Sequence, residues 1–96
     1  MIKSFSHKGL EVFFKKGSKR GIQPKHAERL ETVLDHLSAA ADIKDMNFPG
    51  SNLHKLNPKT PDAEKQVWSL TVSGNWRITF KFFNGDAYEV DYLDYH

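Results

Sequence analysis

The sequence contains no cysteine among its 96 residues. That absence excludes a disulfide framework, a thiolate nucleophile and a cysteine-based zinc site. No apolar run approaches the roughly 20 residues of a membrane-spanning helix, and the opening MIKSFSHKGL lacks the apolar core of a signal peptide. We therefore expect a cytoplasmic protein without membrane contact, whose chemistry depends on His, Asp, Glu, Lys, Arg, Tyr and Ser.

Metal and nucleotide motifs are missing as well. The 5 histidines include no pair spaced three or four residues apart and no HExxH pattern, so we expect no bound metal. There is no Walker loop, GxGxxG element or GxSxG elbow, which argues against nucleotide cofactors and hydrolase-elbow chemistry. The sequence predicts a protein that uses no cofactor.

The net charge is only +2, but the charge is distributed unevenly. The first 29 residues carry eight lysines or arginines against two glutamates, whereas the last 15 carry four acidic residues and no lysine or arginine. A basic half favours a polyanionic partner, attracted by a field that salt screens over about 8–10 Å. The same charges also fit a solvated face, and charge alone leaves both interpretations open.

The N-terminal half has the pattern of a short strand followed by two helices. MIKSF alternates weakly, Ser6 suits a helix N-cap, and Gly17 suits a helix stop. A second helix is expected to begin at Pro24. The apolar positions that recur at helical spacing are Leu10, Phe13 and Phe14 in the first helix, and Ala27, Leu30, Val33 or Leu34, Leu37 and Ala41 in the second.

The C-terminal half predicts an antiparallel meander. Three β-rich runs, QVWSLTV, WRITFKF and DAYEVDYL, are separated by SGN and NG, and NLHKLN before them reads as a short strand that carries His54. The apolar stripes of the helices need a sheet to cover. We expect an α+β fold in one domain, residues 1–96, with an N-terminal strand and a two-helix hairpin packed on one face of a mainly antiparallel sheet.

Two registers are possible for the last hairpin. A two-residue turn at Asn84 and Gly85 would bring acidic residues onto the face of Ile78 and Phe80. A three-residue loop with Gly85 in a left-handed bulge position avoids this and is favoured here, so that Tyr88 and Tyr92 belong to the core and Arg77 lies beside Asp91. The pairs predicted are Phe80 with Tyr88, Ile78 with Val90, Trp76 with Tyr92 and, across the SGN turn, Trp68 with Phe80, Leu70 with Ile78 and Val72 with Trp76.

The face away from the helices gathers groups that can act on a phosphodiester. Arg77 can neutralise a phosphate, while His54 and the terminal Asp-Tyr-His triplet can move protons. Each piece also has an ordinary interpretation, because Arg77 and Asp91 fit a cross-strand ion pair and a lone histidine fits a protein surface. The residues alone therefore leave the activity open.

Several segments together carry a resemblance to a known family: MIKSFSHKGLEVFF, NLHKL, WSLTVSGNWRITFKF, NGDAY and the ending DYLDYH. In these the chain resembles the HigB-type toxins of bacterial toxin–antitoxin systems, a branch of the RelE superfamily. The resemblance implies a RelE-like microbial ribonuclease fold and metal-independent cleavage of translated mRNA in the ribosomal A site. It also implies a helix-turn-helix, HigA-like antitoxin as partner, beside the 70S ribosome and mRNA, and we expect the free toxin to be a monomer.

The resemblance also implies site residues. The family's catalytic positions match His54, Arg77 and the terminal Asp94, Tyr95 and His96 of this chain. Asn57 stands where the family has a lysine, and Lys55 or Lys59 is the candidate to replace that charge. The basic residues expected to hold ribosomal RNA through phosphate contacts are Lys15, Lys16, Lys19 and Arg20.

The expected reaction is attack of an mRNA 2′-hydroxyl on the adjacent phosphate. Arg77 would stabilise the charged transition state, Tyr95 would orient the phosphate or stack on a base, and the order of acid and base among His54, Asp94 and His96 stays open. Two alternatives remain. A gyrase-directed toxin of the same superfamily would not need the terminal triplet, and a non-catalytic RNA-binding module would tolerate Arg77→Ala.

Overall fold

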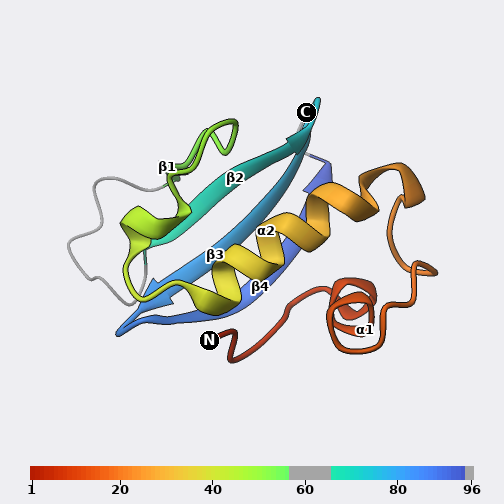
Figure 1. Ribbon diagram of the computed structural model, residues 1–96, viewed down its shortest axis with the longest axis horizontal. Helices are drawn as coiled ribbons and strands as arrows, with labels where there is room; N and C mark the ends of the chain where they lie inside the picture. The colour runs from red at the N-terminus through yellow and green to blue at the C-terminus, as the bar shows by residue number, and fades with distance from the viewer. Residues whose placement is uncertain (57–65, 95–96) are drawn as a thin grey trace.

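The computed structural model describes residues 1–56 and 66–94, with two α-helices and a four-stranded sheet; α2 lies across one face of the sheet and α1 lies beside its β4 edge (Figure 1). The elements in chain order are α1 (Lys8–Lys16), the 3-10 helix η1 (Pro24–His26), α2 (Ala27–Ala39), the 3-10 helix η2 (Ile43–Met46), β1 (His54–Lys55), β2 (Val67–Ser73), β3 (Trp76–Phe83) and β4 (Asp86–Asp94). Neighbouring strands are antiparallel in the order β1-β2-β3-β4. The α+β expectation is confirmed. No helix in the described ranges is long and apolar enough to cross a bilayer.

The predicted N-terminal strand is reduced to two isolated parallel bridges along β4. Ile2 bridges to Ala87 and Phe5 bridges to Val90. The Ser6 amide then donates to the Val90 carbonyl at 2.9 Å, so the backbone leaves the sheet edge only after this residue. This segment covers part of the β4 edge, where unpaired backbone groups would otherwise face solvent.

The first helix begins one residue later than predicted. His7, not Ser6, is the N-cap, and its Nδ1 accepts a hydrogen bond from the Leu10 amide at 3.0 Å. Ser6 lies one residue before the cap, and its amide is bonded to the Val90 carbonyl of β4. The predicted stop is confirmed: Gly17 has φ 76°, and its amide donates to the Phe13 carbonyl.

The second helix is also shorter than predicted. Pro24 opens the 3-10 turn η1, and α-helical geometry starts only at Ala27. Because α2 ends at Ala39 and Ala40 is extended, Ala40 is buried and Ala41 is exposed, so the inclusion of Ala41 in the apolar stripe was wrong.

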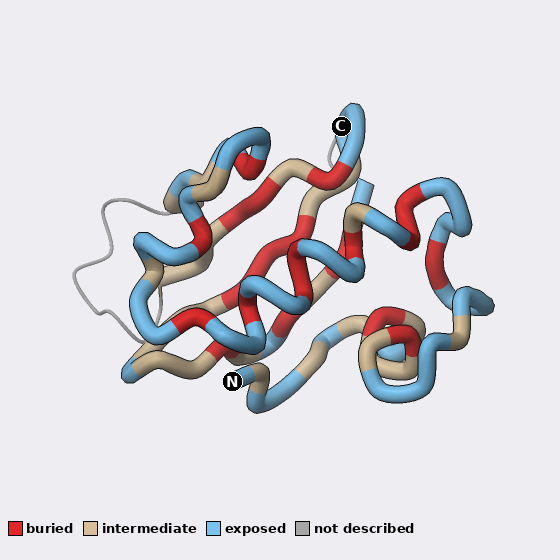
Figure 2. Tube along the Cα trace, in the orientation of Figure 1, coloured by how far each residue is buried: buried red, intermediate tan, exposed pale blue. Residues whose placement is uncertain are grey.

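The core lies between α2 and the sheet (Figure 2). Each large apolar side chain removed from water contributes about 1.5–3 kcal/mol, so this layer supplies most of the driving force for folding. The side chains exposed by 1% or less include Leu10, Leu30, Val33, Leu34, Leu37, Met46, Leu70, Ile78, Phe80 and Val90.

The β2–β3 register is largely as predicted. Trp68 pairs with Phe80 and Leu70 pairs with Ile78. The third predicted pair, Val72 with Trp76, is wrong, because the register shifts at this point and Trp76 pairs with Ser73. The irregularity lies beside the turn that precedes Arg77.

The predicted β3–β4 register is wrong. Ile78 pairs with Tyr92 and Lys81 pairs with Tyr88, so the turn has two residues and the register shifts by one between Thr79 and Lys81. The shift is a bulge at Glu89, whose φ of 53° is unusual for a residue with a side chain. In a regular strand side chains alternate between the two faces along the whole length, and the bulge reverses this alternation between the first and second halves of β4.

The bulge decides which β4 side chains reach the core. Val90 and Tyr92 stay buried, at 0% and 3% exposure, as predicted. Tyr88 is only half-buried and shares the face of Lys81, so its assignment to the core was wrong. Arg77 pairs with Leu93 and not with Asp91, which corrects the predicted cross-strand pair.

Candidate functional site

One continuous row of polar residues crosses the sheet face that is turned away from the helices. His54 on β1 pairs with Ser69, Ser69 pairs with Thr79, and Thr79 pairs with Asp91 on β4. Paired residues of an antiparallel sheet point to the same face. The row therefore places the predicted His54, which is exposed, on the face opposite α2, called the open face below, with Asp91 at its far end. Between them Ser69 and Thr79 are buried, at 1% and 9% exposure.

The imidazole of His54 is exposed and held by the chain just before it. Its Nδ1 lies 2.9 Å from the Asn52 carbonyl oxygen. Since a carbonyl can only accept, Nδ1 carries the proton in the neutral ring, and the lone pair lies on Nε2. Nε2 is thus the atom that can accept a proton from a substrate, or donate one when the ring is protonated.

Arg29 on α2 fixes the loop that leads to His54. Its Nη2 donates to the Gly50 carbonyl at 2.7 Å and reaches the Thr71 carbonyl of β2 at 3.4 Å, and its guanidinium lies 5.6 Å from the centre of the Phe48 ring. From the sequence, Arg29 was only one of the solvating charges. In the structure it joins helix, loop and sheet, a contact that the sequence pattern did not indicate.

The guanidinium of Arg77 folds back over the turn between β2 and β3. Nη1 donates to the Gly74 carbonyl at 2.6 Å and to the Trp76 carbonyl at 3.1 Å. These two hydrogen bonds orient the planar guanidinium group and, within the described residues, leave its Nε and Nη2 donors for an anionic ligand. Arg77 is half-buried on the open face, in the row next to that of His54.

The spacing between Arg77 and His54 suits one phosphate group. Arg77 lies two residues from Thr79 along β3, and β1 lies two strands from β3. With a rise of about 3.4 Å per residue and about 4.8 Å between strands, the two Cα atoms are about 12 Å apart. Two long side chains that point to the same side can both reach a group placed between them.

The terminal triplet is described only in part. Asp94 ends β4 and pairs with Trp76, the neighbour of Arg77, so the last described residue lies at the Arg77 end of the sheet. Tyr95 and His96 lie outside the described residues. Asp91 was expected to pair with Arg77; it lies in the His54 row instead, and its Oδ1 accepts the Tyr92 amide at 2.9 Å.

Of the two candidate lysines, Lys55 does not share the face of His54. Lys55 pairs with Trp68 on the helix side of the sheet, and its Nζ lies 5.3 Å from the centre of the Trp68 ring. Successive strand residues point to opposite faces, so Lys55 points away from the row of His54. Asn57 and Lys59 lie outside the described residues.

The predicted RNA-contacting residues at the N-terminal helix are all exposed, but they differ in surroundings. Lys15 pairs with Glu11 at 2.9 Å, a bond that lowers the pKa of that carboxyl group. Arg20 lines a small cavity together with Trp76 and Tyr92. Arg20 is therefore the member of this basic group that the structure places near the Arg77 end of the sheet; Lys16 and Lys19 are exposed at and after the end of α1.

A cluster of aromatic and histidine side chains lies behind this end of the sheet, and the part of it that His26 and His7 supply was not predicted. Nδ1 of His26 lies 2.6 Å from Oη of Tyr92, and the Trp76 ring stacks on Tyr92 at 4.7 Å between centres. His7 meets Tyr92 edge-on at 5.5 Å. Burial lowers the pKa of His26, and burial also raises the pKa of Tyr92.

This cluster supports the site from the helix side. The Gln23 amide lies 3.4 Å from the phenol oxygen of Tyr92 and donates to it, which leaves the phenol proton for Nδ1 of His26. Since Trp76 immediately precedes Arg77, the cluster fixes the backbone that carries the guanidinium. Burial of Tyr92 was predicted, whereas burial of His26 was not, and their contact joins residues 66 apart in the chain.

The described ranges contain no group of three or more His, Asp or Glu placed to ligate a metal ion. The groups that the described residues place on the open face are the guanidinium of Arg77 and the imidazole of His54, with the carboxylate of Asp91 in the same row as His54. Such a set can bind a phosphodiester and transfer protons.

Comparison with known proteins gives two matches. Residues 3–96 match the model of a family described as the RelE-like toxin of type II toxin–antitoxin system HigB. The curated protein Endoribonuclease HigB from Proteus vulgaris is 45% identical over 96 residues, which is the full length of both chains.

Proposed function

Because this chain belongs to the HigB family of RelE-like toxins of type II toxin–antitoxin systems, we propose that it halts translation by cleaving mRNA in the ribosomal A site. It is an endoribonuclease, as its full-length relative is named. The observation that carries the proposal is the placement of His54 and Arg77 in adjacent rows of the sheet face opposite α2.

In the proposed reaction the 2′-oxygen of one nucleotide forms a bond to the adjacent phosphorus while the bond to the 5′-oxygen breaks. Nε2 of His54 takes the 2′-hydroxyl proton, and an acid from the terminal triplet Asp94, Tyr95 and His96 protonates the leaving 5′-oxygen. Arg77 stabilises the extra negative charge on the phosphate oxygens. The products are a cyclic phosphate and a free 5′-hydroxyl, and no metal is required.

A toxin of this class has a cognate antitoxin. We propose a helix-turn-helix, HigA-like antitoxin, the 70S ribosome and mRNA as the partners, and residues 1–96 as one toxin domain that is monomeric when free and acts in the cytoplasm. The exposed Lys15, Lys16, Lys19 and Arg20 support salt-sensitive contacts to ribosomal RNA. For the lysine that the family has at Asn57, Lys59 is the better candidate than Lys55, because Lys55 lies on the helix side of the sheet.

The test is expression in a translating extract followed by mapping of mRNA 5′ ends. Wild-type protein is expected to produce cuts in phase with codons that require translating ribosomes. Arg77→Ala is expected to abolish them while antitoxin binding and melting temperature are retained, and Lys44→Ala, which removes an exposed cation from η2, serves as the control. Intact mRNA together with blocked DNA supercoiling would overturn the proposal in favour of a gyrase-directed toxin.

A further inference from the structure

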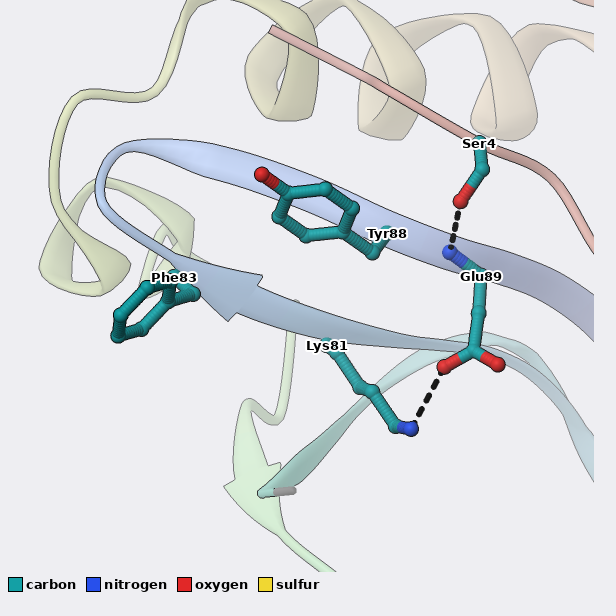
Figure 3. A pocket seen from close by; sticks show the side chains of 5 residues that line it. All are labelled: Ser4, Lys81, Phe83, Tyr88 and Glu89. Carbon is teal, nitrogen blue, oxygen red and sulfur yellow. Dashed lines mark hydrogen bonds and ion pairs between the residues drawn. The ribbon is translucent and has the colours of Figure 1, made fainter. Parts of the chain in front are cut away.

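A hollow of about 470 Å³ opens on the same sheet face as the candidate site, at the other end of β3 (Figure 3). It is lined by Ser4, Lys81, Phe83, Tyr88 and Glu89. This volume lies in the range of pockets that hold small organic ligands. Lys81 is four residues from Arg77, about 13 Å along the strand, so a ligand here lies within a few nucleotides of the candidate site.

The bulge in β4 creates this hollow. In a strand without the bulge, Tyr88 would point to the helix side when Val90 and Tyr92 do, because side chains alternate. The extra residue, Glu89 with φ 53°, turns Tyr88 to the open face and leaves the core residues in place. The Ser4 hydroxyl accepts the Glu89 amide at 2.9 Å and so satisfies a backbone donor that the bulge removes from the ladder. Bulges that re-aim a side chain are common beside active sites.

The lining chemistry favours a nucleobase over a phosphate. The aromatic rings of Phe83 and Tyr88 offer flat surfaces on which a base can stack. Lys81 is paired with Glu89 at 2.6 Å, and this carboxylate offsets the charge that would attract a phosphate. The same pair places a hydrogen-bond donor and an acceptor side by side, which suits the mixed edge of a base.

We propose that this hollow is a base-binding subsite of the enzyme, in which a nucleotide of the mRNA away from the scissile bond stacks on Tyr88 and Phe83. The inference rests on the proposed function, since it takes mRNA to be the substrate on this face. The subsite would bind the mRNA through residues that have no part in the proposed catalysis. A base held there fixes the strand relative to Arg77 and His54.

The first test compares Tyr88→Leu with Tyr88→Phe in ribosome-dependent cleavage. Loss of one base stack is expected to lower kcat/KM on the order of 10- to 100-fold in Tyr88→Leu, whereas Tyr88→Phe keeps the ring and stays within about twofold of wild type. Melting curves establish that both variants fold. Equal kcat/KM for folded Tyr88→Leu and wild type would overturn the subsite, although wild-type cleavage would still uphold the proposed function.

The second test needs no cleavage. The affinity of the free protein for a fluorescently labelled short oligoribonucleotide is measured for wild type, Tyr88→Leu and Phe83→Leu, with Lys44→Ala as the control. Both leucine variants are expected to bind at least about fivefold more weakly than wild type, and equal affinities would overturn the subsite. A photoreactive benzoylphenylalanine at position 88 is expected to crosslink to mRNA on the ribosome; crosslinks to ribosomal RNA alone would overturn the assignment of the base to mRNA.

Discussion

Removing a single oxygen atom from Tyr92 tests how much its hydrogen bond to His26 stabilises the fold behind Arg77. The phenol of Tyr92 and Nδ1 of His26 are 2.6 Å apart, and both residues are 3% exposed. Tyr92→Phe keeps the ring that stacks on Trp76 and deletes only the hydroxyl. The variant therefore isolates the hydrogen bond from the packing.

The expected loss of stability has two parts: the hydrogen bond itself, and the buried Nδ1 of His26 that is left without a partner in the variant. A buried hydrogen bond contributes about 1 kcal/mol net, and a buried polar atom left without a partner costs about 1–3 kcal/mol. We expect Tyr92→Phe to lower the free energy of unfolding by about 2 kcal/mol. For a chain of 96 residues this corresponds to a fall in melting temperature of about 8–16 °C.

The measurement is urea unfolding followed by circular dichroism at pH 7.5, with calorimetry for the melting temperature. Tyr88→Phe removes the same atom from a half-buried tyrosine on the open face and is expected to change stability by less than about 0.5 kcal/mol. If the two variants were equally stable, the reasoning from the His26 hydrogen bond would be refuted.

Three further outcomes are expected. Burial lowers the pKa of His26 below its usual 6.5, so at pH values near and below 6.5 the unfolded chain binds more protons than the folded chain. The free energy of unfolding should therefore fall as pH drops through about 6.5, and a free energy that stays constant from pH 7.5 to pH 5 would contradict this. Gly21→Ala should lower the free energy of unfolding by about 1–3 kcal/mol, because the new Cβ would lie 2.5 Å from the Gly9 Cα. In the control Gly74→Ala the new Cβ meets no atom within 4 Å, so the only cost is the strain of a positive φ. If both variants lost the same free energy of unfolding in chemical denaturation, the close contact would be excluded as the cause. Arg29→Met keeps most of the aliphatic part of the side chain but loses the hydrogen bond to the Gly50 carbonyl in the loop before β1. The kcat of cleavage, measured at saturating ribosomes, should therefore fall about tenfold with little change in antitoxin binding. An unchanged kcat would show that Arg29 does not position the site.

The sheet and its open face were predictable because short-range patterns determine them. Alternation in WRITFKF places Arg77 opposite the apolar face whatever its partner strand does, and the run around His54 forms a strand as expected. The β3–β4 register was only partly predictable. The observed two-residue turn at Asn84 and Gly85 was one of the two alternatives, but the bulge at Glu89, which keeps Val90 and Tyr92 buried with this turn, was not expected. The Glu89 amide donates to the Ser4 hydroxyl, 85 residues away. No turn or propensity signal in the sequence marks such a contact.

The candidate site, too, was predictable where local sequence patterns determine it and not where distant contacts do. His54 and Arg77 could be singled out because imidazole and guanidinium groups suit phosphate chemistry and lie on segments with a clear pattern. The supporting contacts of Arg29 and His26 were missed, because each depends on where a distant backbone or side chain lies after folding. Sequence patterns thus located the groups on the open face but not the residues that hold them.

The most direct test of the central claim is cleavage of ribosome-bound mRNA that carries a single 2′-deoxynucleotide at the mapped cut site. The proposed attack by the 2′-hydroxyl predicts that this substitution abolishes the cut there, while all-ribose mRNA gives fragments with a cyclic phosphate and a free 5′-hydroxyl. Undiminished cleavage of the deoxy-substituted mRNA would contradict the mechanism assigned to His54 and Arg77.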